Sequence, residues 1–503
     1  MAFSRPIRNC CLKFREIVGN RFLESVAPYS SIKTEVERVS KIISSHPFPD
    51  QSLFPVLQSH IPSSHLSTVF VESVLGRLFA THSNGLKALE FFRFSLNHPD
   101  YVPSSDAFEK TLHILARMGY FEKAWELMHE ISKSHRSLLT TKSMNTLLAR
   151  IAKYGSYEDA VTAFERMEKE IFNISFGTDE FNTLLVAFCT QRTMRDAQTL
   201  FEQMCNRFSP NTKTWNILLL GFKEKGDITS MEIFFHDLRR RGFQPNRVTF
   251  SIRIDAYCKK GYIADAQRIL AEMEDAKYPP SLDLLTTLVH GAGIAKNASK
   301  AWEFFEEIGK RRMEPDIAAY NALISSLAQC GEMNGIVDLM AIIDEKGMPF
   351  DDVTYRTVFS VLMKTCDIES VVDLYRMMIS RDFVPEERTV VMLVKFMCLN
   401  GLLEEGMELW KHILAKGYCP HPNALHILVT ALCSRSRVDE ALECCKQLLE
   451  TRKSPKKETF FMLERFCLKN RQMKRLKEID QLLSRQQRHL PPRTCPQQLV
   501  LET

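Results

Sequence analysis

Hydrophobic residues recur in two helical patterns that alternate along most of the chain. In the first pattern they are three or four residues apart, as at Phe181, Leu184 and Phe188. In the second, a small residue is followed four positions later by a large hydrophobic one, as at Ala197 and Phe201. Both spacings place the hydrophobic side chains on one face of an α-helix. Each pair of patterns therefore predicts a helical hairpin.

The pair of patterns repeats with a nearly constant period. Aligned on an aromatic residue followed by a small polar one, the blocks start at Ser105, Thr141, Thr178, Thr212, Arg247, Leu282, Ile317, Asp352, Glu387, Pro422 and Lys457. The successive starts are 36, 37 and 34 residues apart and then seven times 35 residues apart. Because one hairpin cannot bury both of its hydrophobic faces, neighbouring hairpins must stack. The sequence predicts an all-α fold, a right-handed superhelical solenoid of stacked helix–turn–helix repeats.

Glycine and proline mark the expected turns. A glycine recurs between the two helices of a block, where a tight turn favours positive φ, at Gly119, Gly155, Gly226, Gly261, Gly331 and Gly401. Proline recurs near the block ends, at Pro210, Pro245, Pro280, Pro315, Pro385, Pro420 and Pro455. Proline cannot continue a helix and favours an extended residue before it. These residues predict where each helix ends.

Blocks such as 247–281 and 317–351 resemble pentatricopeptide repeats of the P class, which is found in plant organelles. Residues 66–104 resemble the degenerate first repeat that often opens such proteins. On this resemblance we expect a linker at 31–65, an array of about eleven repeats at 105–490 and a C-terminal tail at 491–503.

Composition and charge exclude several other classes of protein. Hydrophobic residues make up 45% of the 503 residues and charged residues 25%, with a net charge of +5, so a packed core is expected. The 14 cysteines include no C-x-x-C motif, which disfavours a zinc site. The chain contains no Walker loop, no H-E-x-x-H and no deaminase signature, and no apolar run long enough to span a membrane. We therefore expect neither an enzyme nor a cofactor or metal.

The N-terminal segment is basic and weakly amphipathic. Five basic residues precede position 23, with Glu16 as the only acid, and hydrophobic residues are scattered between them. This composition is typical of an organelle transit peptide and lacks the continuous apolar core of a secretory signal. We expect residues 1–30 to direct import into an organelle, the alternative being an ordinary basic tail. The mitochondrion is favoured over the chloroplast because serine is sparse and arginine abundant in this segment.

The resemblance implies a single-stranded RNA-binding protein in which each repeat addresses one base. The base is read by the fifth residue of a repeat and by its last residue, directly before the next block. The pairs are Asn145 with Gly177, Asn182 with Asn211, Asn216 with Asn246, Ser251 with Ser281, Thr286 with Asp316, and Asn321 with Asp351. Short polar side chains of this kind match the hydrogen-bonding edges of bases.

The resemblance also implies base preferences for these pairs. The two Asn–Asn pairs resemble pyrimidine readers that favour C, Thr286 with Asp316 resembles a guanine reader, and Asn321 with Asp351 resembles a uracil reader. The Ser–Ser pair is ambiguous, with a purine favoured, and the pair that begins with Asn145 indicates no base. The implied core is 5′-Y-Y-R-G-U-3′. The pairs outside residues 141–352 fit no familiar combination.

Two further features bear on binding. Second residues of blocks, expected to wedge between bases, are valine only at Val248 and Val353. Basic residues recur at the end of the first pattern, at Arg117, Lys153, Lys259, Lys364 and Lys469. A stacked array would present them to phosphates, or they complement the helix dipole and stay solvated.

Two further expectations concern the recurrent cysteines and the kind of molecule that the protein binds. Cysteines at one repeat position, Cys189, Cys258, Cys398 and Cys433, are expected to pack in the core, because repeats about 10 Å apart cannot share a metal ion. Organellar RNA is the expected partner, with protein cofactors of RNA metabolism and without DNA. The alternative function is a protein-binding scaffold, such as a mitochondrial ribosome-associated component.

Overall fold

The computed structural model describes residues 30–62, 66–99, 101–451, 455–469, 474–475 and 477–479. All regular elements in this part of the chain are helical. The expected transit peptide, apart from Ser30, and the expected tail at 491–503 lie outside the described residues. The described chain divides into two compact units, one ending at Pro280 and the other beginning at Ser281.

The unit that ends at Pro280 contains six repeats, each with a first and a second helix. The first helices are α4 (Thr68–Ala80), α6 (Ser105–Arg117), α8 (Thr141–Tyr154), α10 (Thr178–Gln191), α12 (Thr212–Lys225) and α14 (Arg247–Lys259). The second helices are α5 (Gly85–Leu96), α7 (Phe121–Ser134), α9 (Tyr157–Arg166), α11 (Met194–Met204), α13 (Ile228–Arg240) and α15 (Ile263–Asp275).

The unit that begins at Ser281 continues the same alternation. Its first helices are α16 (Leu282–Ile294), α18 (Ile317–Cys330), α20 (Asp352–Lys364), α22 (Glu387–Leu399), α24 (Pro422–Ser434) and α26 (Lys457–Lys469). Its second helices are α17 (Ala298–Lys310), α19 (Met333–Glu345), α21 (Ile368–Ser380), α23 (Leu403–Ala415) and α25 (Val438–Glu450).

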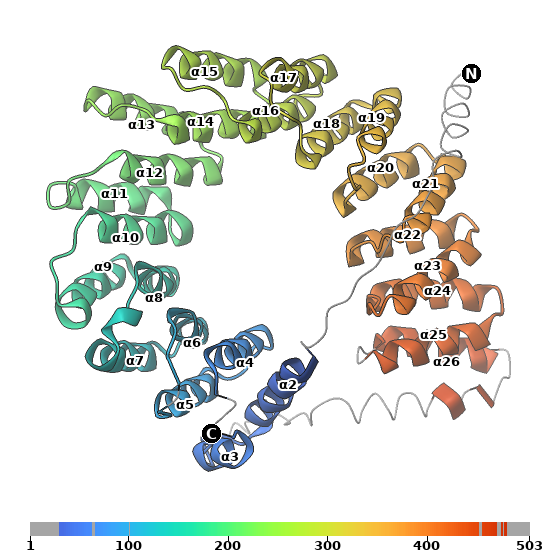
Figure 1. Cartoon of the computed structure of the whole chain (residues 1–503), viewed down its shortest axis with the longest axis horizontal. Coiled ribbons are helices and arrows are strands. Elements are labelled where there is room, and N and C mark those ends of the chain that lie inside the picture. Colours follow the sequence, from blue (N-terminus) through green and yellow to red (C-terminus); the bar gives the residue numbers. More distant parts are fainter. Residues whose placement is uncertain are drawn as a thin grey trace, which may run out of the picture. The chain divides into compact units, whose positions relative to one another are not determined.

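Within each unit the first helices form one layer and the second helices form another (Figure 1). Each first helix contacts the first helix of the next repeat in its unit, as α10 does α12 and α18 does α20. Most first helices also pack against the second helix of their own repeat. This arrangement confirms stacked helical hairpins. We call the row of first helices the first-helix layer.

The helix starts were predicted correctly because their signals are local. Each of the eleven predicted block starts is the first residue of a first helix. Polar side chains such as Thr140, Asn246 and Asp351 directly precede these helices and accept a hydrogen bond from the backbone N–H of the third helical residue. Such N-caps typically stabilise a helix by ~1 kcal/mol.

The two repeats longer than 35 residues accommodate their extra residues at or after the end of the second helix. In the 36-residue repeat a single 3-10 turn, η3 (Arg136–Leu138), follows the second helix. In the 37-residue repeat the second helix continues as a π-helix, η4 (Met167–Phe172), and ends at Asn173 with φ 47°. A π-helix accommodates an inserted residue without breaking the helix, so the hydrophobic face stays in register.

The predicted glycine turns are correct at five of six positions. Gly119, Gly226, Gly261, Gly331 and Gly401 have φ between 71° and 87°. Gly155 has φ −93°, so the prediction of positive φ is wrong there. A side chain there would meet the Ile151 carbonyl oxygen at 3.0 Å. Gly155 is therefore favoured because the Ile151 carbonyl oxygen lies too close to leave room for a side chain.

The segment expected to be a linker contains two helices, α2 (Ser30–Ser45) and α3 (Phe54–His60). Helix α2 contacts α4, and α3 contacts α5. Val39, Ile43 and Leu57 are at most 1% exposed. The segment therefore extends the hydrophobic core of the first repeat, because its apolar side chains share one helical face.

Two packing details follow the sequence expectations. Gly291 and Gly293 lie inside α16, and Gly293 allows α16 to approach α18 closely, because a Cβ there would lie 2.6 Å from the Ser326 Cα. The cysteines at the shared repeat position are buried except for Cys398, which is half-buried. Burial raises the pKa of the Cys258 thiol to about 12, so it packs as a small hydrophobic group.

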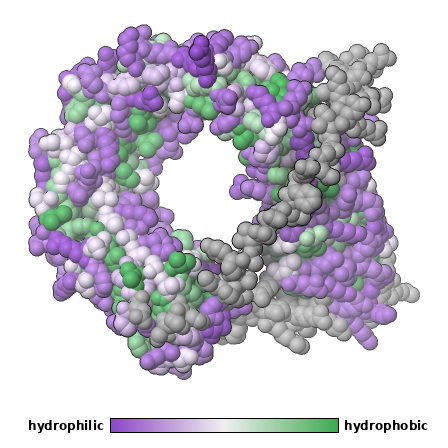
Figure 2. Space-filling model, viewed as in Figure 1, coloured by the Kyte–Doolittle hydropathy of each residue, from purple (hydrophilic) through white to green (hydrophobic). Residues whose placement is uncertain are grey.

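The surface is mixed in character. On the face seen in Figure 2, hydrophilic residues predominate and hydrophobic ones occur in small groups. No helix among the described residues combines the length and hydrophobicity that crossing a membrane requires.

Candidate functional site

The predicted site residues occupy the ends of helices in the first-helix layer. Each fifth residue lies in the first or second turn of a first helix, and each last residue directly precedes the next first helix. The fifth residue of one helix therefore lies near the N-terminus of the helix stacked against it.

The last residues are helix caps. The side chains of five of them each accept a hydrogen bond from the backbone N–H of a residue three positions on: Asn211, Asn246, Ser281, Asp316 and Asp351. Gly177 has no side chain with which to cap α10, and Glu180 instead accepts a hydrogen bond from the Gly177 N–H at 2.8 Å. The cap explains the residue types at these positions without any ligand. Evidence for a site must come from further contacts.

Asn216 and Asn246 form such a contact. Asn216 Nδ2 donates to Asn246 Oδ1 at 3.3 Å, and the Thr249 hydroxyl donates to Asn216 Oδ1 at 2.8 Å. The backbone N–H of Thr249 donates to Asn246 Oδ1 at 3.0 Å. A backbone N–H can only donate, so this contact fixes the orientation of the Asn246 amide and leaves its Nδ2 group directed elsewhere.

Asn321 and Asp351 repeat the arrangement with a carboxylate. Asn321 Nδ2 lies 3.0 Å from both oxygens of Asp351, and the Thr354 hydroxyl lies 2.6 Å from Asn321 Oδ1. The backbone N–H of Thr354 donates to Asp351 Oδ1 at 2.8 Å. The structure thus brings the predicted fifth and last residues together in these two repeats.

Asn182 and Asn145 are not bonded to their predicted partners. Asn182 is only 2% exposed, and neither its Oδ1 nor its Nδ2 atom has a hydrogen-bond partner among the described residues. The Oδ1 atom of Asn145 is likewise buried without a partner in the described chain. An unpaired buried polar group costs about 1–3 kcal/mol. These side chains are therefore groups that a ligand could satisfy.

The serine and threonine at fifth positions behave differently again. The Ser251 hydroxyl donates to the carbonyl oxygen of Arg247 in its own helix at 2.9 Å. Ser251 and its predicted partner Ser281 belong to different compact units. Thr286 is half-buried, and no hydrogen bond joins it to Asp316 in the described part of the chain.

The fifth residues are more buried than the sequence suggests. Asn182, Asn216 and Asn321 are 2%, 8% and 8% exposed, whereas Asn246 and Asp351 are half-buried and Asn211 is exposed. A ligand would therefore meet the last residue of a pair first and the fifth residue beneath it.

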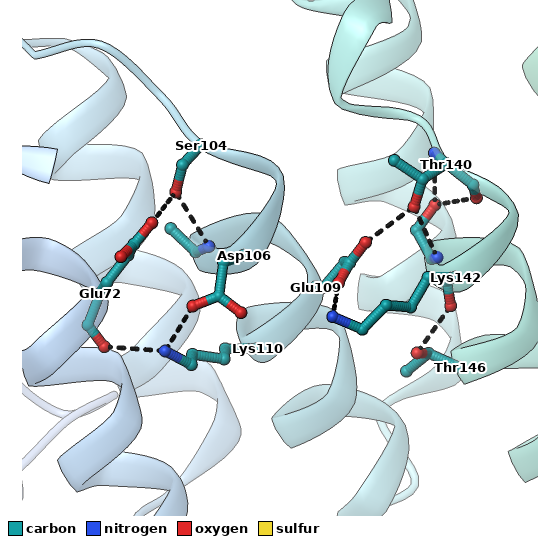
Figure 3. A network of polar contacts seen from close by, with 10 residues as sticks. Glu72, Ser104, Asp106, Glu109, Lys110, Thr140, Lys142 and Thr146 are labelled. Atoms are coloured by element: carbon teal, nitrogen blue, oxygen red, sulfur yellow. Dashed lines mark hydrogen bonds and ion pairs between the residues drawn. The ribbon is translucent and has the colours of Figure 1, made fainter. Parts of the chain in front are cut away.

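The two N-terminal repeats carry a related pair at their junctions, in which a hydroxyl bonds a glutamate (Figure 3). The Ser104 hydroxyl donates to Glu72 Oε1 at 2.6 Å, and the Thr140 hydroxyl donates to Glu109 Oε1 at 2.7 Å. Lys142 forms an ion pair with the other oxygen of Glu109. Because both Glu109 oxygens have partners in the chain, this pair is structural. Glu72 lies 37 residues before Glu109, so extending the 35-residue register upstream points to Val74 instead.

The basic series divides into bound and solvated members. Arg117 donates to the Phe79 carbonyl oxygen at 3.0 Å and lies over the Phe79 ring. Lys259 forms ion pairs with Glu224 and Asp255. The contacts with Phe79 hold the Arg117 guanidinium against its own protein, so Arg117 is poorly placed to bind phosphate.

The other three members differ from these. Lys153 is exposed beside the Tyr154 ring. Lys364 and Lys469 are exposed at the ends of α20 and α26. All three retain the solvent access that phosphate contact requires.

Second residues also fall into two kinds. Val248 and Val353 are 53% and 42% exposed, as a base wedge requires. Lys213 Nζ and Asp179 Oδ1, from adjacent repeats, form an ion pair at 2.9 Å. No group of three or more metal-ligating side chains occurs among the described residues.

Stacked 35-residue hairpins with polar pairs at their junctions define a helical-repeat protein. Three family models match it. The PPR repeat family matches residues 210–259 and 315–364, the PPR repeat matches 248–278 and 353–383, and the pentatricopeptide repeat domain matches 284–330.

Relatives carry the same repeats. Pentatricopeptide repeat-containing protein At3g61360 of Arabidopsis thaliana is 54% identical over 316 residues, which cover 63% of this chain and 64% of that protein. The mitochondrial pentatricopeptide repeat-containing protein At3g22670 of the same plant is 28% identical over 201 residues, covering 40% of this chain and 35% of that protein. The matched regions span less than two thirds of each relative.

A solved structure shares the fold. The crystal structure of the pentatricopeptide repeat protein PPR10 from maize matches with a TM-score of 0.52 at 20% identity, covering 86% of this chain and 61% of that one. The family models thus show that the chain carries pentatricopeptide repeats within residues 210–383, and the relatives that it resembles are pentatricopeptide repeat-containing proteins.

Proposed function

We propose that this protein is a sequence-selective, single-stranded RNA-binding protein of an organelle. It acts by occupying its RNA site, and so affects the processing, stability, splicing or translation of a transcript. The observation that carries the proposal is the bonded pair of fifth and last residues at two repeat junctions, Asn216 with Asn246 and Asn321 with Asp351. A capping role alone requires no contact with the fifth residue.

The free groups of the Asn321 and Asp351 pair complement uracil. One N–H of Asn321 is directed at the Asp351 carboxylate, so the other can donate to a uracil carbonyl oxygen. The carboxylate can accept the uracil N3–H. Cytosine would place its N3 acceptor against the carboxylate, and such a mismatch costs about 1–3 kcal/mol.

The free groups of the Asn216 and Asn246 pair complement cytosine. Asn246 Oδ1 accepts from Thr249 and from Asn216, which leaves the Asn246 Nδ2 group to face a ligand. Two amide donors match the N3 and O2 acceptors of cytosine. The same pair opposes the N3–H of uracil with a donor.

The remaining residues serve affinity. Val248 and Val353 supply exposed apolar surface for base stacking, and Lys153 and Lys364 supply charge for phosphates. Asn145, Asn182 with Asn211, and Thr286 with Asp316 are proposed as further contacts of the same strand, and we propose no catalytic step. The mitochondrion is the proposed compartment, in line with the names of several mitochondrial relatives.

Selection of randomised RNA against the purified full chain tests the proposal. We expect enrichment of the core 5′-Y-Y-R-G-U-3′, and weaker binding of single-stranded DNA of the same sequence. Recovery of RNA without any shared core would contradict sequence-selective binding and favour the protein-scaffold alternative.

The compartment is tested separately. Residues 1–30 fused to a fluorescent protein in plant cells should carry it to mitochondria. Fluorescence that stays in the cytosol, or enters chloroplasts, would contradict this part of the proposal.

A further inference from the structure

We propose that Thr249 and Thr354 are positioning residues that set base specificity from across a repeat boundary. Each is the third residue of a repeat, and each bonds the fifth residue of the preceding repeat. The inference rests on the proposed RNA-binding function and deepens it, because it assigns specificity to a residue outside the fifth and last pair.

The threonine completes a chain of hydrogen bonds with one allowed direction. The backbone N–H of Thr249 makes Asn246 present its oxygen, so Asn216 must present Nδ2 to Asn246. Asn216 Oδ1 then faces the Thr249 hydroxyl, which must donate. Thr249 is 0% exposed, so the acceptor that competes for this proton is Asn246 Oδ1, at 3.0 Å against 2.8 Å for Asn216 Oδ1.

The orientation of the fifth residue decides what a base meets. With the hydroxyl in place, Asn216 can offer a ligand only its remaining N–H. Without the hydroxyl, Asn216 Oδ1 has lost its donor and only the contact with Asn246 still holds the amide, so a rotated amide could offer its oxygen to a base more often and the donor pattern that selects cytosine would be weakened. Thr354 acts in the same way on Asn321, where the Asp351 carboxylate makes the orientation equally strict.

The protein contains a natural comparison for this effect. Asn182 and Asn211 form the same residue pair as Asn216 and Asn246, and Thr214 is the matching third residue. Thr214 is also 0% exposed and also bonds its N-cap, Asn211 Oδ1, at 3.1 Å.

The Asn182 amide, however, has no partner in the described chain. Its repeat is 34 residues long, and 32 residues separate Asn182 from Thr214 where 33 separate Asn216 from Thr249. The two junctions thus differ both in this spacing and in whether the threonine bonds the fifth residue. We therefore expect the Asn216 repeat to prefer cytosine over uracil more strongly than the Asn182 repeat does.

Binding measurements on Thr249→Val and Thr214→Val test the inference. The probe is a synthetic RNA of the selected core with C or U at the base facing Asn216 and, separately, at the base facing Asn182. Thr249→Val should reduce the preference for C at the Asn216 base, measured as the Kd for U divided by the Kd for C, roughly fivefold, the loss that one net hydrogen bond accounts for.

Thr214→Val is the matched control. It loses the same capping contacts and a similarly buried hydroxyl, so it should lower Tm by a similar amount without changing either ratio. Thr249→Ser keeps a hydroxyl at this position, so it should show the same base preference as the wild-type chain. Thr354→Val gives a second test in the other unit, where the preference for U, measured as the Kd for C divided by the Kd for U, should fall.

The outcomes separate the two proposals. If the wild-type chain discriminates and Thr249→Val and Thr354→Val discriminate equally well, the positioning role is wrong while the proposed function stands. If both valine variants lose affinity equally for every base, in proportion to their loss in Tm, the threonines stabilise the fold and do not set base specificity. If the wild-type chain shows no base preference at any position, the proposed function itself fails.

Discussion

At the scale of single residues, one side chain at each junction has two tasks. Asp351 caps α20 and also accepts from Asn321, and Asn246 caps α14 and accepts from Asn216. Capping uses only part of the hydrogen-bonding capacity of an Asn or Asp side chain. The remaining atoms are available to a ligand, so stability and specificity can be changed separately.

Replacing Asp351 with asparagine should move the preference of its repeat from U toward C. Asparagine caps a helix about as well as aspartate, so Tm should change little, while the carboxylate that accepts the uracil N3–H is replaced by a donor. Competition binding with RNAs that differ at this one base measures the shift. An unchanged preference for U would show that Asp351 does not contact the base.

The site was predictable from sequence only in part. The identity of the pairs follows from the register of the repeats, because position in a repeat fixes position in the layer. The contacts of Thr249 and Thr354 were not predictable, since they depend on where two stacked helices meet to within an ångström. The involvement of Arg117 with Phe79 was missed for the same reason.

At the scale of helices, sequence information was richest at the starts and poorest at the ends. N-caps and prolines act on neighbouring residues in the sequence, so the helix starts could be predicted from them. Several turns instead place a non-glycine residue at positive φ, as at Lys296, Cys366 and Ser436. Helix α2 was missed although Val36, Val39 and Ile43 share a face, because it lacks the aromatic residue on which the repeats were aligned.

Close packing of α16 on α18 can be tested at Gly293. Gly293→Ala should destabilise the protein by about 1–3 kcal/mol, because the added methyl group would overlap Ser326. The matched control is Gly309→Ala in α17, where nothing lies within 4 Å and alanine should slightly stabilise the helix. Thermal unfolding of both variants measures the difference. Equal Tm values would contradict the close approach.

Buried thiols predict a loss of stability in alkali. Burial raises the pKa of Cys189 and Cys258 to about 12 from an ordinary value of 9. Between these values the unfolded chain loses the proton and the folded chain keeps it, so the free energy of unfolding falls as pH rises above 9. The loss is ~1 kcal/mol per thiol at pH 10.

Denaturant titrations between pH 8 and pH 10.5 measure this dependence. Cys258→Ala should have a lower stability at pH 8, because it leaves a small cavity, but a shallower decline with pH. A slope equal to that of the wild-type chain would show that the thiol ionises as readily when folded.

At the scale of the whole molecule, the chain is an array of similar junctions in two compact units. The division at Pro280 and Ser281 separates the members of the Ser251 and Ser281 pair, which is also the pair whose base preference the sequence left ambiguous. Affinity should come from many phosphate contacts along the array, and specificity from the few bonded junctions.

The dependence of RNA affinity on salt distinguishes the basic residues. Lys364→Gln should lower the slope of log K against log salt by about 0.7, the value for one phosphate contact to a single strand. Arg117→Gln should lower Tm and leave the slope unchanged, because this guanidinium contacts Phe79. Binding titrations from 50 to 200 mM salt give both slopes. Equal effects of the two substitutions on the slope would contradict the assignment of Lys364, and not Arg117, to phosphate contact.

The threonine contacts also bear on how such proteins could be rebuilt by exchanging modules. A cassette cut at the repeat boundaries, such as 212–246, carries Asn216 and Asn246 but leaves Thr249 with the recipient. A graft that ends three residues later transfers the complete recognition unit. The same cassette should therefore show a stronger or weaker base preference depending on the third residue of the repeat that follows it.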